Sequence, residues 1–142
     1  MTLNELEIQV KKDLRIDRSD LSYEAIRTPD IFNDYNKMIF HEKLALKDLE
    51  RKWDILYLER WEYYRKKAPE EIYQKEPLLK KIMDSDVKNY LNADNELQNL
   101  RKQIDGKEEI IDFLKRTLDN IANRQWLIKA ANDNNKYLQG EK

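Results

Sequence analysis

The fold is decided by the stretch TPDIFNDYNKMIFHEKLALKDLERKWDILYLERWEYYRKKAP, which runs from Thr28 to Pro69. Its apolar and aromatic residues recur at alternating steps of three and four, a pattern typical of a long helix that packs lengthwise against other helices. Thr28 and Pro29, a hydroxyl N-cap followed by proline, predict the start of this helix, and Pro69 predicts its end near Ala68. At about 1.5 Å per residue the helix would be roughly 55–60 Å long. The repeating positions are Phe32, Tyr35, Ile39, Glu42, Leu46, Leu49, Trp53, Leu56, Arg60 and Tyr63.

Two of these repeating positions, Glu42 and Arg60, are polar. A charge in a closed apolar interface is costly unless it is paired or stays in contact with water. One interpretation is that the two residues fix the register of the packed helices. The other is that Arg60, which stands among rings and cations, marks a point where the packing opens onto a ligand.

The composition also favours long helices with narrow apolar faces. Among 142 residues, 39% are charged and 40% hydrophobic, with only 2 Gly and 3 Pro. A chain of this size is expected to form a single domain. The net charge of −1 gives no general attraction for nucleic acid, so any such site must be local. The sequence has no apolar run that would cross a membrane and no signal-peptide core, so we expect an intracellular protein without membrane contact.

Shorter helices are expected around the long one. Thr2 and Glu5 have capping-box spacing ahead of an apolar face, and Ser19 is expected to cap a second short helix that ends near Thr28. We expect one all-α domain over residues 1–142. Residues 1–67 would hold the N-terminal helices and the long helix, 68–79 a connector, and 80–142 a short helix and a long C-terminal helix.

A second heptad-like pattern begins near Asp94 and predicts that C-terminal helix. The short connector favours an antiparallel hairpin of the two long helices, and the surplus apolar surface favours self-association. Gly106 is a position for a bend or break, and the tail from Asn132 to Lys142 is expected to fray. The residues expected to support assembly of several chains are Leu97, Leu100, Ile104, Ile111, Leu114, Leu118, Ile121 and Ile128.

Several kinds of chemistry lack the residues that they need. With no cysteine, there are no disulfides, thiolate metal sites or cysteine nucleophile. The only glycines, Gly106 and Gly140, do not form a phosphate-binding loop. The single histidine, His41, is interpreted as a residue of the helix surface, because a zinc site needs three or four ligands. We therefore predict a protein that is not an enzyme and that has no metal and no cofactor.

One segment remains as a candidate binding site, Trp53 to Lys67, which is rich in rings and ends in a basic run. Its rings fall on one side of a helix and could stack on unpaired bases, while its cations could follow the phosphates. The ordinary alternative is that rings at helical spacing form the core and that cations near a helix end complement its dipole. The predicted contact residues are Tyr57, Arg60, Trp61, Tyr64, Arg65, Lys66 and Lys67, with Trp53 in the same row of rings.

The chain resembles the UvsY family of recombination mediators from T-even-like bacteriophages over nearly its whole length. The resemblance is carried by collinear short patterns rather than by one motif. They are Leu3, Leu6, Lys11-Lys12-Asp13, Ile16-Asp17, Leu21, Tyr23-Glu24-Ala25, Arg60-Trp61-Glu62-Tyr63-Tyr64, Leu91, Ala93-Asp94, Asp112-Phe113, Leu118-Asp119, Ile121, Arg124 and Ile128-Lys129.

This resemblance implies a ring-forming homo-oligomer that binds single-stranded DNA in the cytoplasm of an infected bacterium. It would load a RecA-like phage recombinase onto DNA coated by the phage single-strand-binding protein. The family's central motif has two cations implicated in DNA contact, and this chain keeps Arg60 but has Leu58 in place of the lysine. Arg65, Lys66 and Lys67 could supply the missing charge. The family's C-terminal region is associated with self-assembly.

The competing hypothesis is a coiled-coil scaffold that organises proteins without binding nucleic acid. In that case Trp53 and Trp61 would be buried among the packed helices, and their fluorescence would not respond to an oligonucleotide. A hydrolase that uses acid pairs would need a pocket with converging carboxylates, which long helices seldom provide.

Overall fold

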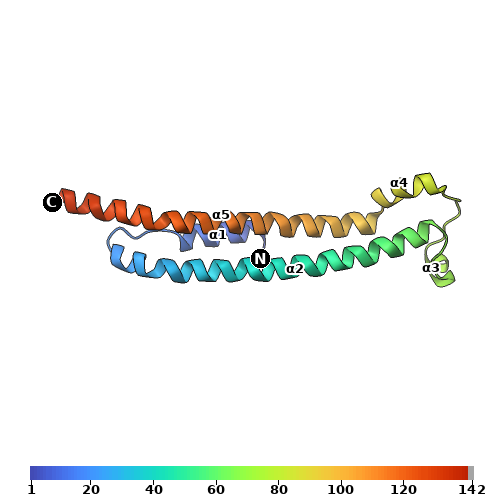
Figure 1. Cartoon of the computed structure of the whole chain (residues 1–142), viewed down its shortest axis with the longest axis horizontal. Helices are drawn as coiled ribbons and strands as arrows, with labels where there is room; N and C mark the ends of the chain where they lie inside the picture. Colours follow the sequence, from blue (N-terminus) through green and yellow to red (C-terminus); the bar gives the residue numbers. More distant parts are fainter. Residues whose placement is uncertain (141–142) are drawn as a thin grey trace. The chain divides into compact units, whose positions relative to one another are not determined.

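A computed structural model describes residues 1–140, and all its regular elements are helices. In the described residues no strand occurs, which confirms the all-helical prediction. The elements are α1 (Leu3–Asp13), α2 (Leu21–Tyr64), α3 (Glu70–Lys75), a 3-10 turn (Asp84–Asp86), α4 (Val87–Asn92) and α5 (Asn95–Leu138) (Figure 1). No helix within this part of the chain combines the length and the apolar character needed to span a membrane.

The chain divides into two compact units, and each of the long helices α2 and α5 has a part in both of them. The first unit holds Met1–Lys43 and the C-terminal part from Glu109 onward, and the second unit holds Leu44–Glu108. In the first unit, α1 packs with parts of α2 and α5, and the predicted capping box of Thr2 and Glu5 is present. Its core consists of Leu6, Ile31, Tyr35, Ile39, Leu114 and Ile121.

In the first unit, α2 begins earlier than predicted, at Leu21 rather than after Thr28, and continues through Pro29. A proline cannot donate the backbone hydrogen bond that the carbonyl of Ala25 would receive in a regular helix. Here the side-chain amide of Gln125 on α5 donates to that carbonyl at 3.3 Å. Tertiary contact thus replaces the missing donor, and the separate short helix expected after Ser19 is the first part of α2. Ser19 instead donates to Asp17, and the Asp20 carboxylate accepts from the N–H of Tyr23 at 3.3 Å.

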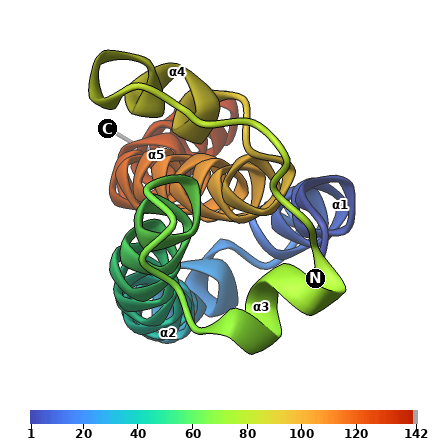
Figure 2. The same ribbon diagram turned by 90° about the vertical axis from the view of Figure 1, so that its right-hand side faces the viewer.

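The second unit contains the end of α2, the start of α5 and the short helices between them. Figure 2 shows α3 beside the end of α2 and α4 beside the start of α5. The core of this unit consists of Ile82, Val87, Leu91 and Leu97, and Trp53, Leu56, Trp61, Tyr64, Leu78 and Tyr90 pack against it. The short helix expected between the connector and the long C-terminal helix is present as α4. The residue numbers of facing pairs rise on α2 as they fall on α5, so the two helices are antiparallel within this unit.

Two further predictions about α5 are wrong. The helix runs through Gly106 without a break, and it continues to Leu138, so residues 132–138 do not fray. Residues 141–142 of the predicted frayed tail lie outside the described part of the chain. The buried face of α5 includes two polar residues, Thr117 and Arg124, which the apolar pattern does not predict. Gln125, the neighbour of Arg124, is exposed.

Candidate nucleic-acid interface

Arg60 lies inside the second unit, with only 8% of its side chain exposed. Its Nε donates to Asp94 Oδ2 at 2.7 Å, and its Nη1 and Nη2 donate to the two carboxylate oxygens of Glu76 at 2.9 and 3.1 Å. The guanidinium also stands 4.3 Å from the ring centroid of Tyr63. The structure therefore places Arg60 in a buried ion pair and not on an open surface. A phosphate contact at this residue would first have to displace Glu76.

Asp94 organises this network from the start of α5. Its Oδ1 accepts from the N–H of Leu97 at 3.0 Å, which caps the helix, while its Oδ2 accepts from Arg60 and from the hydroxyl of Tyr64 at 2.6 Å. Burial alone would raise the pKa of Asp94, but these hydrogen bonds and the Arg60 charge outweigh it, so the pKa lies below its ordinary value. Burial and the hydrogen bond to Asp94 raise the pKa of Tyr64 to about 12. Asp94 is thus ionised at neutral pH, and Tyr64 is a neutral donor to it.

A groove of about 570 Å³ opens beside Arg60, and its charge is unfavourable for a phosphate. Glu76 occupies the outer edge of the guanidinium, and further carboxylates line the walls against only two cations. The net negative charge of these walls repels an anionic strand. The charged residues that line the groove are Glu59, Glu62, Glu76, Glu96, Arg60 and Lys75.

Trp61 brings cations and a ring together at the end of α2. The Arg65 guanidinium lies 5.2 Å and the Lys67 amine 5.4 Å from the Trp61 ring centroid. Arg65 also pairs with Asp84 at 3.2 Å, so part of its charge is compensated. Within residues 1–140 Lys67 takes part in no ion pair, and its side chain is exposed. Of the predicted residues, Trp61, Arg65 and Lys67 are thus brought together in one cluster.

Lys66 follows directly in a left-handed backbone conformation, with φ of 57°. Its N–H donates to the carbonyl of Tyr63 at 3.1 Å, and the N–H of Lys67 donates to that of Glu62 at 2.8 Å. These two bonds form the motif that closes many helices, in which glycine is the usual residue at this position. The motif ends α2 at Tyr64, three residues before Lys67, the last residue of the predicted helix. It holds Lys66 and Lys67 beyond the last turn of the helix, and both are exposed.

The remaining predicted rings differ in how accessible they are. Tyr57 is 40% exposed, and its ring centroid lies 6.1 Å from that of Trp53. Tyr64 is less available, because its hydroxyl is bonded to Asp94 and its ring packs 5.7 Å from Tyr90. Trp53 and Trp61 are half-buried against the core of the second unit. In the predicted row of rings, Tyr57 is thus exposed and lies between two half-buried tryptophans, Trp53 and Trp61.

The residues predicted to support assembly are mostly covered within the single chain. All of them except the half-buried Leu118 are buried, with exposed fractions from 1% for Leu114 to 8% for Leu100. In the first unit Leu114, Leu118 and Ile121 pack with residues of α1 and α2, and in the second unit Leu97 packs with residues of α4. Other side chains of α5 are exposed and apolar. These are Trp126, Leu127, Tyr137 and Leu138.

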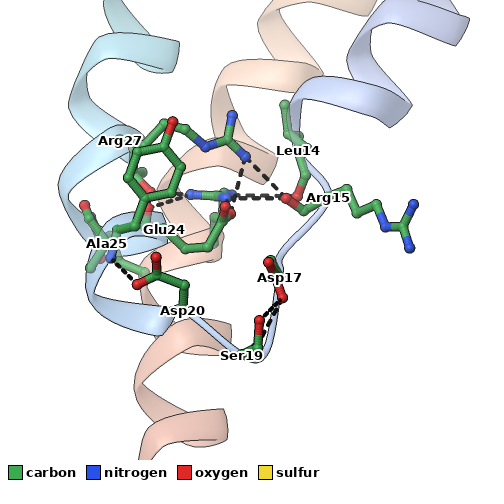
Figure 3. A network of polar contacts seen from close by, with 12 residues as sticks. Leu14, Arg15, Asp17, Ser19, Asp20, Glu24, Ala25 and Arg27 are labelled. Carbon is green, nitrogen blue, oxygen red and sulfur yellow. Dashed lines mark hydrogen bonds and ion pairs between the residues drawn. The ribbon is translucent and has the colours of Figure 1, made fainter.

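A second buried ion pair, in the first unit, is structural. Arg124 of α5 donates to the Glu24 carboxylate and to the Thr28 hydroxyl, and its Nη1 also donates to the carbonyl of Glu24 at 2.8 Å. Figure 3 shows Glu24 and Arg27 on α2 directed toward the backbone at Leu14 and Arg15, where α1 ends. Burial lowers the pKa of Arg124, and the Glu24 charge opposes this effect. The network joins the end of α1 to both long helices. Because 39% of the residues are charged, spacing in the sequence does not reveal which of them form this pair.

Two comparisons relate this chain to known proteins. Residues 9–141 match the profile of the family described as recombination, repair and ssDNA binding protein UvsY. The chain is also similar to crystal structures of the recombination mediator protein UvsY of bacteriophage T4. The lattice type II structure has a TM-score of 0.85 at 23% identity, with 98% of each chain covered. The type I structure has a TM-score of 0.83 at 22% identity, with 94% of this chain and 98% of that chain covered.

At such identities the structural likeness shows the fold alone, and among curated protein sequences none matches this chain. The family match extends over nearly the whole chain, from α1 to the end of α5. The chain therefore belongs to the UvsY family of recombination, repair and single-stranded DNA binding proteins.

Proposed function

We propose that this protein binds single-stranded DNA at the end of α2 and acts as a recombination mediator that catalyses no reaction itself. The observation that carries the proposal is the contact of Lys67, which has no ion-pair partner in the described residues, with the Trp61 indole ring. The exposed Lys66 precedes Lys67 in the chain and adds a second positive charge at the end of α2. The ammonium groups would hold phosphates, and the rings of Trp61 and Tyr57 would stack on bases. Arg65 contributes a partly compensated charge, while Arg60 and Tyr64 support the site through Asp94.

Several copies would hold one strand together, so that weak individual sites give tight binding through a high effective concentration. A strand held in the conformation that a RecA-like recombinase prefers would favour that recombinase over the phage single-strand-binding protein. This exchange needs no fuel and no cofactor, and it would take place in the cytoplasm of the infected host. Family membership supports the role in recombination.

We also propose that several chains assemble into a ring-like homo-oligomer. The residues predicted to form the contacts between chains are mostly buried within one chain, so other residues would form those contacts. The buried series from Leu97 to Ile128 would hold α5 in place within the chain, and subunits would contact one another through exposed apolar side chains of α5. Leu127 and Leu138 are 62% and 73% exposed, and eleven residues of a helix make about three turns, so they share one face.

A double substitution tests the proposed DNA site. Changing Lys66 and Lys67 together to Gln should weaken binding of a single-stranded oligonucleotide about tenfold or more at low salt and should flatten its salt dependence by about 1.4 in the log–log slope, at about 0.7 per phosphate. The matched control changes Lys11 and Lys12, another exposed pair, to Gln. Equal affinities of parent and Lys66/Lys67 variant would place the site elsewhere.

The scaffold hypothesis keeps one observation in its favour, the packing of Trp53 and Trp61 against the core of the second unit. It predicts that tryptophan emission does not change when oligonucleotide is added. The DNA-binding proposal predicts quenching that saturates, because stacking on a base alters the surroundings of an indole.

A further inference from the structure

The second unit contains four cations that lie over aromatic rings, and they differ in whether a carboxylate compensates them. Arg60 is held by Asp94 and Glu76, and Arg65 is paired with Asp84. Within the described residues Lys67 and Arg101 lie over rings and take part in no ion pair. A cation without a carboxylate partner can bind a phosphate without first breaking an ion pair. These two residues are therefore the available charges of this set.

Arg101 reaches the row of rings from a different helix. It is an exposed residue of α5, and its guanidinium carbon lies 4.9 Å from the ring centroid of Trp53 on α2. Trp53, Tyr57 and Trp61 follow at intervals of four residues, so each step along α2 is about 6 Å. Arg101 thus stands at one end of this row, and Lys67 stands over Trp61 at the other end.

This spacing suits a strand with unpaired bases. The two tryptophans are separated by about 12 Å along the helix, so the two cations would bind different phosphates of one strand. Tyr57, 40% exposed between them, would offer its face to a base. A planar guanidinium can bind a phosphate through two parallel hydrogen bonds while it remains stacked on an indole. Duplex DNA would not use the rings, because its bases are already stacked and paired.

We infer that Arg101 of α5 is a further single-stranded DNA contact, which holds a phosphate at the Trp53 end of the row that starts at Lys67 and Trp61. This inference rests on the proposed function and extends it from the end of α2 to α5. The strand would then cross both helices of the second unit. Sequence reasoning confined the site to 53–67 and could not include Arg101, which only the packing of α5 on α2 brings to Trp53.

The test compares Arg101→Gln with Lys102→Gln, a neighbouring exposed residue of α5 that carries the same charge. In the full-length protein, we expect Arg101→Gln to weaken binding of a dT oligonucleotide roughly three- to tenfold and to make the log–log salt slope shallower by about 0.7. Lys102→Gln should stay within about twofold of the parent. Arg101→Lys should keep the salt slope but bind less tightly, because the ammonium lacks the planar, bidentate geometry.

A second readout follows Trp53 directly. In a background with Trp61→Phe and Trp126→Phe, Trp53 is the single indole, because the chain has 3 Trp. Oligonucleotide should quench its emission, and Arg101→Gln should reduce that quenching. The inference is overturned if Arg101→Gln matches the parent in affinity and slope, if Lys102→Gln loses as much, or if Arg101→Gln changes only the thermal unfolding midpoint. Absence of single-strand binding by the parent itself would instead reject the proposed function.

Discussion

At the scale of single residues, the buried pair of Arg60 and Asp94 decides which charges remain for DNA. Removing Arg60 leaves the Asp94 carboxylate, with 2% of its side chain exposed, without its cation. We expect Arg60→Ala to lower the free energy of unfolding by about 3–5 kcal/mol, measured by urea denaturation. Any loss of DNA binding in this variant would follow from damage to the second unit.

Glu76→Gln is the matched control for that substitution, because 52% of the Glu76 side chain is exposed and the change leaves Asp94 in place. It should cost about 1 kcal/mol or less. If Arg60→Ala unfolds at the urea concentration of the parent, the pair does not stabilise the fold as described.

The Asp94 carboxylate also predicts a dependence of stability on pH. Its folded pKa lies below the ordinary value of 3.8, so the folded protein binds this proton less readily than the unfolded chain does. Its stabilising contribution is therefore complete above about pH 5 and is lost as the pH falls below about 4 through the folded pKa. The difference in free energy of unfolding between the parent and Asp94→Asn should shrink between about pH 6 and about pH 3. A difference that stays constant over this range would contradict the assignment.

Some of these residue roles could be read from the sequence and others could not. Arg60 stands out in the sequence as a polar residue in an apolar pattern, and fixing the register of the packed helices is one of its two interpretations. Its partner Asp94 lies 34 residues away, and spacing within one helix cannot reveal such a pair. The uncompensated charge of Lys67 likewise became evident only when the ion pairs of its neighbours were known.

At the scale of helices, Gly106 shows how packing overrides a local preference. Glycine in a helix costs stability because the unfolded chain gains freedom, yet α5 continues through this position. A Cβ built at Gly106 meets nothing within 4 Å. We therefore expect Gly106→Ala to raise the free energy of unfolding by about 0.5–1 kcal/mol.

Gly140 provides the contrast, because its φ of +78° is one that a side chain disfavours. Gly140→Ala should bring no gain in the same urea experiment. If Gly106→Ala destabilised the protein instead, the helix would have to bend or open at Gly106 in solution.

The existence of both long helices and the start of α5 near Asp94 could be predicted from the three-and-four pattern, whereas the limits of α2 and the end of α5 could not. Thr28 and Pro29 predict a helix start because a hydroxyl N-cap precedes proline, but α2 continues through Pro29 and the Gln125 side chain of α5 donates to the Ala25 carbonyl instead. The end near Ala68 was placed too late because Lys66 takes a left-handed conformation without being glycine. Both errors arise where a tertiary or turn contact satisfies a backbone group that sequence rules treat as lost.

At the scale of the whole molecule, self-association is predicted to use the open face of α5. Leu127→Lys together with Leu138→Lys should lower the mass in solution, measured by light scattering after size exclusion, toward that of one chain, because two apolar contacts become charges. The control adds the same charge at Asn120 and Asn123, which are exposed and polar. A parent protein that is already a monomer in dilute buffer, or a double variant with unchanged mass, would rule out this interface.

The central claim is that uncompensated cations and rings of the second unit hold an unpaired strand. A titration of single-stranded against double-stranded oligonucleotide at two salt concentrations, monitored by tryptophan emission, tests it most directly. With three phosphates held per subunit, by Lys66, Lys67 and Arg101, the account predicts preference for the single strand and a log–log salt slope of about −2 per subunit. Equal binding of the duplex, a slope near zero, or emission that does not respond would contradict it.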